Sequence, residues 1–211
     1  MLGLKNQILI TFNYKGSRMT KSYEFTRETK IINNEITLKR IRAIRDIGPD
    51  VKAGDLGGWI EKESNLSDNA WVFEDAEVYG NARVYGNAWV FGDARVCGDA
   101  WVFEDAWVCG NSRVYGNALV FDNAEVCNDT KVYNNVKVYG NTGVSGAARV
   151  YGNAWVFEDA EVYGNARVSG DAWVYNNARV YDNAEVYGNA KVFGEARVFG
   201  NTKVYGNAWL Y

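Results

Sequence analysis

The sequence predicts an all-β fold in which the chain winds into a coil of short, parallel strands. The main observation is one aliphatic residue every six positions, from Val72 through Val204 to Leu210, without a slip. Ile60 and Leu66 extend this series toward the N-terminus, which gives 26 sites in one register. Gly-Asn or Gly-Asp pairs recur with the same period, and no proline lies inside the series. A strict short period indicates one structural unit that repeats and stacks on its neighbours.

The composition of the repeat favours strands over helices. The six positions read Val, aromatic, Gly, Asn or Asp, Ala and a variable residue, as in residues 84–89. Glycine and asparagine at every sixth position disfavour a helix, and a period of six does not match 3.6 residues per turn. We therefore expect strands of about four residues, joined at corners where Gly-Asn and Gly-Asp pairs tolerate a positive φ.

Two arrangements of such strands compete. In an antiparallel meander each Val would oppose an Arg, Trp or Glu, so no apolar face would form. In a parallel coil of three repeats, residue n lies beneath residue n+18, which stacks Val78 on Val96 and Val114 and buries the aliphatic residues together. The second arrangement is expected. It predicts a triangular turn of 18 residues and about eight coils from Val72 onward.

The pattern aliphatic-x-x-Asn/Asp-small-x resembles the hexapeptide repeat of left-handed parallel β-helices, and the resemblance covers about 150 residues. It implies a left-handed coil, whereas general crossover chirality would favour the other hand. One departure from that family is clear. The position after the aliphatic residue is usually small, but here it is Tyr or Phe in 19 of 24 repeats.

The preceding segment is also familiar. Residues 38–46 (LKRIRAIRD) and 51–60 (VKAGDLGGWI) are similar to the start of bacterial and phage hexapeptide-repeat proteins that are often labelled as transferases. This similarity implies a shared cap and helix start, but no known reaction. We expect residues 1–56 to form a small N-terminal β cap, with strands at 7–13 and 36–44, and residues 57–211 to form the β-helix. The cap would cover strand edges that otherwise promote aggregation.

No catalytic, metal-binding or cofactor-binding residues can be assigned from the sequence. Hexapeptide acyltransferases typically use a catalytic histidine, and the carbonic anhydrases of this fold bind zinc through histidines, but this chain has none. Both uses are excluded unless another group substitutes. The paired acids Glu104-Asp105 and Glu158-Asp159 fall at corners, where we expect solvated side chains. We therefore expect a non-enzymatic protein without a cofactor, with an acyltransferase relative, active or degenerate, as the alternative.

The three cysteines, Cys97, Cys109 and Cys127, are expected to be free thiols that fill aromatic positions. Cys109 and Cys127 are 18 residues apart, but a coil spacing of about 4.8 Å is interpreted as a little long for a disulfide. No apolar run is long enough to span a membrane, and the N-terminus lacks a signal-peptide pattern. We expect a soluble, cytoplasmic protein that does not bind a membrane.

The outward positions sort into three faces, and one of them, here called the aromatic face, has an aromatic residue in every coil. Such a stripe would exceed the apolar patch that a monomer usually tolerates, so we expect a homo-oligomer, either a dimer or a trimer, that forms through it. Stacked rings that only stabilise neighbouring coils are the alternative. The expected interface residues are Trp101, Phe103, Phe121, Trp155, Phe157, Trp173, Tyr175, Phe193, Trp209 and Tyr211.

A second face, here called the basic face, has cations at five consecutive coils with tyrosines beside them. Interleaved cations and aromatics suit a polyanion or an acidic protein, although acidic corners could neutralise the cations locally. An acidic protein is preferred over nucleic acid as the partner. The expected partner-binding residues are Arg95, Arg113, Tyr115, Lys131, Tyr133, Arg149, Tyr151 and Arg167.

Three classes of function remain open. The leading one is a non-enzymatic binding or scaffold protein that presents patterned flat faces to a macromolecule, and the phage resemblance suggests an accessory role such as inhibition of a host defence. The alternatives are an acyltransferase-like protein and a protein that binds nucleic acid or another polyanion along the basic face. Binding of acetyl-CoA would identify the second class, and salt-sensitive retention of DNA or RNA would identify the third.

Overall fold

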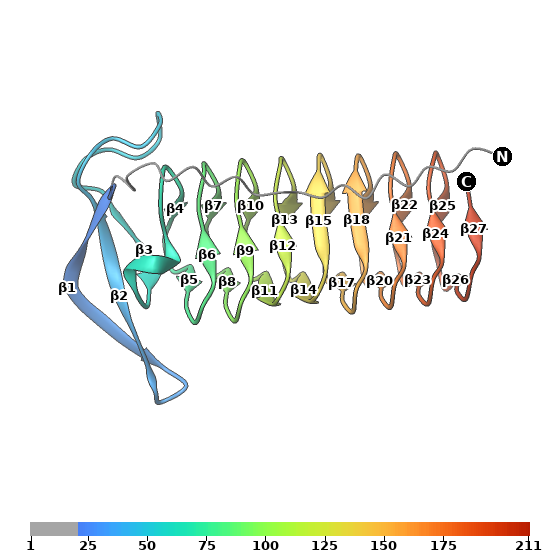
Figure 1. The fold of residues 1–211 in the computed structure, drawn as a ribbon, viewed down its shortest axis with the longest axis horizontal. Helices are drawn as coiled ribbons and strands as arrows, with labels where there is room; N and C mark the ends of the chain where they lie inside the picture. Colours follow the sequence, from blue (N-terminus) through green and yellow to red (C-terminus); the bar gives the residue numbers. More distant parts are fainter. Residues whose placement is uncertain (1–20) are drawn as a thin grey trace.

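The computed structural model describes residues 21–211, which form a β-solenoid with a β-hairpin across its N-terminal end (Figure 1). The hairpin consists of β1 (Tyr23–Ile32) and β2 (Ile36–Ala43), and it is followed by β3 (Leu56–Ile60) and the short 3-10 helix η1 (Glu63–Asn65). The remaining strands lie in three parallel stacks, one for each face predicted from the sequence.

The basic face belongs to an 11-stranded sheet. The first three strands of this sheet are β1, β2 and β3, and the other strands form the basic face. Its strands after β3 are β5 (Glu77–Val78), β8 (Arg95–Val96), β11 (Arg113–Gly116), β14 (Lys131–Asn134), β17 (Arg149–Val150), β20 (Arg167–Val168), β23 (Glu185–Val186) and β26 (Lys203–Val204).

The other two sheets have eight strands each. The aromatic face consists of β6 (Arg83–Val84), β9 (Trp101–Val102), β12 (Leu119–Val120), β15 (Lys137–Gly140), β18 (Trp155–Glu158), β21 (Trp173–Val174), β24 (Lys191–Val192) and β27 (Trp209–Leu210). The third sheet, here called the mixed face, consists of β4 (Trp71–Val72), β7 (Trp89–Val90), β10 (Trp107–Val108), β13 (Glu125–Val126), β16 (Gly143–Val144), β19 (Glu161–Val162), β22 (Arg179–Val180) and β25 (Arg197–Val198).

Pairing within the solenoid is parallel and joins residue n to residue n+18, as predicted. Val114 pairs with Val96 on one side and with Val132 on the other. The strands are two or four residues long, and most are shorter than the expected four, because the corners take up the rest of each repeat. The all-β parallel solenoid of about eight coils is therefore confirmed, while the left hand and the triangular outline stay predictions.

The inward positions form one continuous apolar core. Val78, Val96 and Val114 are fully buried, as are most of the alanines that follow each corner. Where Thr130 and Thr142 replace alanine, each hydroxyl donates a hydrogen bond of 2.7 Å to a backbone carbonyl three residues earlier. The core accepts these polar groups because their hydrogen bonds are satisfied.

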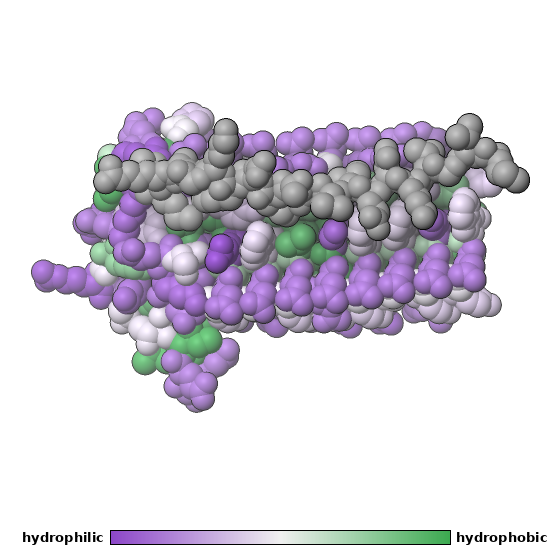
Figure 2. Space-filling view, in the orientation of Figure 1, coloured by the Kyte–Doolittle hydropathy of each residue, from purple (hydrophilic) through white to green (hydrophobic). Residues whose placement is uncertain are grey.

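The corners adopt the positive φ that the sequence predicts, and acidic residues occupy some of them in place of glycine. Gly116 has a φ of 72°, while Glu104 and Glu158 have 59° and 61°. The Glu104 carboxylate accepts a hydrogen bond of 3.0 Å from the backbone N–H of Asp122, and Glu158 accepts one of 3.0 Å from Asn176. These acids therefore link successive corners. Rows of hydrophilic side chains follow the long edges of the solenoid (Figure 2).

The hairpin packs onto the first coils as a cap. β2 pairs antiparallel with β3, which continues the 11-stranded sheet by pairing parallel with β5. Tyr23 and Ile41 join the core, and the buried Glu77 forms ion pairs of 2.7 Å with Lys30 of the hairpin and 3.1 Å with Arg95 of the solenoid. The strand expected at 36–44 is confirmed as β2, whereas the one expected at 7–13 lies outside the described residues.

One expectation about the cysteines is wrong. Cys109 and Cys127 form a disulfide across neighbouring coils of the mixed face, and only Cys97 is a free thiol. The two Cα atoms are 4.5 Å apart, and disulfides commonly span about 4.4 to 6.8 Å between Cα atoms. The spacing of adjacent coils is therefore compatible with a disulfide, contrary to the interpretation from the sequence.

Candidate binding faces

The basic face brings the five predicted cations into one row. The end members are paired with acids: Arg95 lies 3.1 Å from Glu77, and Arg167 lies 3.6 Å from Glu185. The three central cations are Arg113, Lys131 and Arg149. Among residues 21–211, no Asp or Glu side chain lies within ion-pair distance of any of them. Like charges repeated at coil spacing repel each other, although salt screens this repulsion because the side chains face solvent. An anion bound along the row would relieve this repulsion.

A ladder of tyrosine rings lies beside the central cations. Tyr115 and Tyr133 stack with ring centroids 4.9 Å apart, and Tyr133 and Tyr151 with 5.2 Å. The rings are nearly parallel, with interplanar angles of 1° and 5°. Burial raises the pKa of Tyr115 and of Tyr133, so both hydroxyls stay protonated at neutral pH. The eight predicted partner-binding residues thus lie together on one sheet.

Two coils of the basic face lack a ring, and the surface is hollow at both. At the first, Cys97 replaces the aromatic residue between Tyr79 and Tyr115, and a hollow of about 220 Å³ lies there. At the second, Ser169 lies between Tyr151 and Tyr187, with a hollow of about 230 Å³. The sequence contained the signal, since both positions are exceptions to the aromatic pattern, but it did not identify either hollow.

The walls of these hollows carry charge and hydrogen-bonding groups. The first is also lined by Arg95, Arg113 and Lys131, and the second by Arg167 and Glu185. Burial raises the pKa of Tyr79 to about 12, with a further contribution from a hydrogen bond to the Cys97 thiol. Burial also raises the pKa of that thiol, so it is mainly protonated at neutral pH. The first hollow is therefore positively charged, and the second contains a cation paired with an acid.

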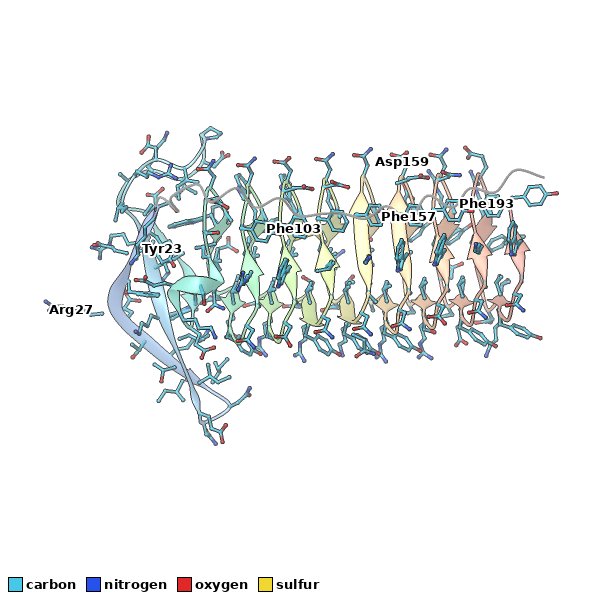
Figure 3. The ribbon with its side chains drawn as sticks, viewed as in Figure 1. Tyr23, Arg27, Phe103, Phe157, Asp159 and Phe193 are labelled. Atoms are coloured by element: carbon cyan, nitrogen blue, oxygen red, sulfur yellow. A yellow bond between two sulfur atoms is a disulfide. The ribbon has the colours of Figure 1, made fainter. Side chains whose placement is uncertain are left out.

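The aromatic face holds the predicted interface residues on one sheet, where many of their rings stack on each other. Phe103, Phe157 and Phe193 lie in one row along it (Figure 3). From Phe103 to Phe193 the ladder steps are 4.8 to 5.1 Å between ring centroids. Trp155 and Trp173 form a second stack at 5.2 Å. Stacking between coils stabilises the solenoid by itself, which is the alternative role expected for these rings.

Less of this face is exposed than the sequence suggested. Phe103 and Phe121 are only 2% and 7% exposed, whereas Trp209 and Tyr211 of the last coil are 66% and 86% exposed. Lysines also cover the central tryptophans. The Lys137 ammonium lies 4.2 Å from the Trp155 ring centroid, and the Lys191 ammonium lies 4.5 Å from that of Trp173. The accessible apolar area is therefore concentrated toward the C-terminal end of the face.

The other groups singled out from the sequence have structural contacts. The corner carboxyl of Glu104 has a raised pKa, chiefly because of partial burial and then because of the neighbouring carboxyl of Asp122. Within residues 21–211 there is no cluster of three or more His, Cys, Asp or Glu side chains that could hold a metal ion. In the same part of the chain, no helix has the length and apolar character needed to cross a membrane.

Comparison with known families supports the repeat architecture. Residues 76–92 and 160–176 match the family described as the YdcK β-solenoid repeat. Each match covers about one coil, and the second includes Ser169. Among curated proteins, none matches this chain. The match therefore supports a β-solenoid repeat, while the resemblance to hexapeptide-repeat transferases stays a prediction.

Proposed function

We propose that this protein is a non-enzymatic binding scaffold, which self-associates through the aromatic face and offers the basic face to an anionic macromolecule. The observation that carries the proposal is the row of Arg113, Lys131 and Arg149, which face outward without acidic partners among the described residues. A row of like charges on a rigid support is costly to keep, and an anionic partner offsets that cost.

The solenoid suits such a role because its stacked sheets fix the spacing of every outward side chain. Backbone hydrogen bonds connect each coil to the next, as between Arg113 and Thr130 at 2.9 Å and between Trp155 and Ala172 at 2.9 Å. A partner therefore meets preformed rows and loses little free energy in ordering them. Self-association would place several basic faces in one particle and raise the effective affinity for a long partner.

Light scattering tests the self-association. The wild-type protein is expected to have a mass that is a multiple of 23.6 kDa, and the double variant Trp155→Glu/Trp173→Glu is expected to be a monomer. Both side chains point outward, so the β signal in circular dichroism should persist. The matched control is Tyr163→Glu/Tyr181→Glu, which alters a stacked pair on the mixed face and should leave the mass unchanged. A wild-type monomer at tens of micromolar would refute self-association through this face.

A further inference from the structure

The two hollows of the basic face are places where one ring is missing from an aromatic ladder. At ordinary rungs, neighbouring rings fill the ladder with a step of about 5 Å, as Tyr115 and Tyr133 do. At Cys97 and Ser169 the coil continues but the ring is absent, so the rings above and below are two steps apart. Each hollow lies between two tyrosines, Tyr79 and Tyr115 or Tyr151 and Tyr187, and its volume of about 220 or 230 Å³ can hold one planar ring. In the first hollow, an incoming ring would displace the hydrogen bond between the Tyr79 hydroxyl and the Cys97 thiol.

This arrangement is confined to the basic face. The aromatic face has a ring after every inward aliphatic residue from Tyr85 to Tyr211, so it has no missing rung. The mixed face lacks rings at three consecutive coils, where Cys109 and Cys127 form the disulfide and Ser145 follows. That gap is too long for a single ring to contact an aromatic residue on both sides. Single-ring vacancies with a Tyr on each side thus occur on the same sheet as the cation row.

The row of five cations begins at the coil of the first vacancy and ends at the coil of the second. Arg95 lies in the coil of the first vacancy, and Arg167 lies in the coil of the second. The three cations that have no acidic partner within residues 21–211 occupy the coils between them. The two vacancies are four coils apart, or about 19 Å at the usual strand spacing. One continuous row therefore has a hollow at each end, where the cation is paired with an acid, and positive charge without such partners in the coils between the hollows.

We propose that this site binds nucleotide units, with bases inserted at Cys97 and Ser169 and with phosphates along the cation row. The inference rests on the proposed function, because it identifies the anionic partner of the basic face. Stacking of bases on aromatic side chains within a positively charged groove is the general mode of single-strand recognition. A protein partner was preferred from the sequence, but paired tyrosine walls around a ring-sized gap favour a ligand that has a flat ring beside each anionic group. Either a single strand or a free nucleotide supplies that chemistry.

The sharpest test fills the vacancies with the residue that the ladder otherwise contains. In the double variant Cys97→Tyr/Ser169→Tyr, the new rings should occupy the slots and leave every cation in place. Binding is measured by fluorescence anisotropy with a labelled single-stranded deoxyadenosine oligomer of about eight nucleotides, a length within the usual range of single-strand sites. We expect the affinity to fall at least roughly tenfold, since each inserted base loses its stacking partners. Ser145→Tyr, the same kind of change on the mixed face, is the matched control and should bind like wild type.

Competition by adenosine monophosphate distinguishes a free nucleotide from a single strand. Binding of polyglutamate separates this inference from the proposed function. If free nucleotides are the ligands, adenosine monophosphate should displace the labelled oligomer. If a single strand is the ligand, adenosine monophosphate should displace the oligomer only at a far higher concentration. Polyglutamate carries the charge without the rings. If the filled variant binds the oligomer as wild type does, or if wild type binds polyglutamate but not the oligomer, the nucleotide inference is wrong and the anionic-partner proposal stands. If wild type binds none of the three probes, both are wrong.

Discussion

Single residues decide whether this repeat can fold, because most inward positions have the same residue type above and below. Val114 is fully buried between Val96 and Val132. We expect Val114→Asp to lower the free energy of unfolding by at least about 3 kcal/mol, since an unpaired carboxylate would enter an apolar column. Urea denaturation measures this loss. The adjacent Arg113→Asp, which faces solvent, should cost far less, and equal effects of the two changes would show that the inward assignment is wrong.

A second prediction at this scale concerns the corner acid Glu104, whose pKa is raised in the folded protein. A carboxyl with a raised folded-state pKa favours folding below its ordinary pKa, and that contribution is lost as the pH rises through the folded-state value. Glu104→Gln removes the ionisation. We therefore expect its thermal midpoint, compared with wild type, to be higher at pH 7 than at pH 4, by roughly 1 to 2 °C because the group is mostly exposed.

Asp122 provides the control for that pH dependence, because its carboxyl is one of the causes of the raised pKa. In an Asp122→Asn background, the pH-dependent effect of the Glu104→Gln substitution on the thermal midpoint should shrink. Differential scanning calorimetry of the four proteins at the two pH values gives the midpoints that this comparison needs. An unchanged effect would mean that the neighbouring carboxyl does not contribute.

Several residue-scale features could not be read from the sequence. The sequence marked Cys97 and Ser169 as exceptions to the aromatic pattern, but an exception does not show whether neighbours close over the gap. That depends on ring orientation, which only the packed structure provides. The Cys109–Cys127 disulfide was missed for another reason, since the coil spacing lies inside the allowed range and spacing alone cannot decide between thiols and a bond.

The six-residue period predicts some strands of the structure and not others. Between β4 and β27 the period of six predicts each strand position, register and inward residue, because every repeat has the same local chemistry. Outside the repeat this information ends. Strand β2 was expected, but its partner β1 was not, because residues 26–30 (TRETK) interrupt the alternation of apolar and polar side chains. The hairpin is stabilised by contacts to the first coil that no local pattern encodes.

Those contacts make the link between cap and solenoid testable. A Cβ atom at Gly58 in β3 would lie 2.7 Å from the carbonyl oxygen of Ala76 and 2.7 Å from a methyl group of Val72. The backbone atom cannot move without breaking the pairing of β3 with β5. We expect Gly58→Ala to destabilise the protein by about 1 to 3 kcal/mol, as overpacking of a close contact does.

Gly143 in β16 is the matched control, because a Cβ atom there would meet nothing within 4 Å. Gly143→Ala should be neutral or slightly stabilising, since it restricts the unfolded chain. Chemical denaturation of both variants, together with hydrogen exchange of the β3 amides, makes the comparison. If the two glycines respond alike, the close packing of β3 against the first coils is not the cause.

At the scale of the whole molecule, the solenoid converts a sequence period into rows of side chains on flat sheets. The period predicted the faces and the residues on each, which is why the predicted partner-binding and interface residues lie together. It could not predict their accessibility. On the aromatic face Phe121 is buried, whereas Trp209 in the last coil, which has no following coil, is exposed.

The basic face is the part of the molecule on which the functional account depends. Its row of Arg113, Lys131 and Arg149 distinguishes it from the mixed face, where Arg179 is paired with Glu161 at 3.2 Å. Net charge alone would not favour an anionic partner, since the chain carries −3. The proposal therefore requires that the local arrangement of cations, and not the total charge, determines binding. A variant that removes the row can be compared directly with one that removes the same number of cations elsewhere.

The most direct measurement is the salt dependence of binding for two such triple variants. Three proteins are titrated with labelled polyglutamate and with the labelled oligonucleotide. They are wild type, the basic-face variant Arg113→Gln/Lys131→Gln/Arg149→Gln and the control Arg83→Gln/Arg179→Gln/Arg197→Gln. For three charge contacts to a single strand, the affinity of wild type should fall roughly twentyfold between about 50 and 200 mM salt. We expect the control to behave like wild type, and the basic-face variant to bind weakly with little dependence on salt. Equal losses in both variants would contradict the account, because binding would then follow net charge and not the row on the basic face.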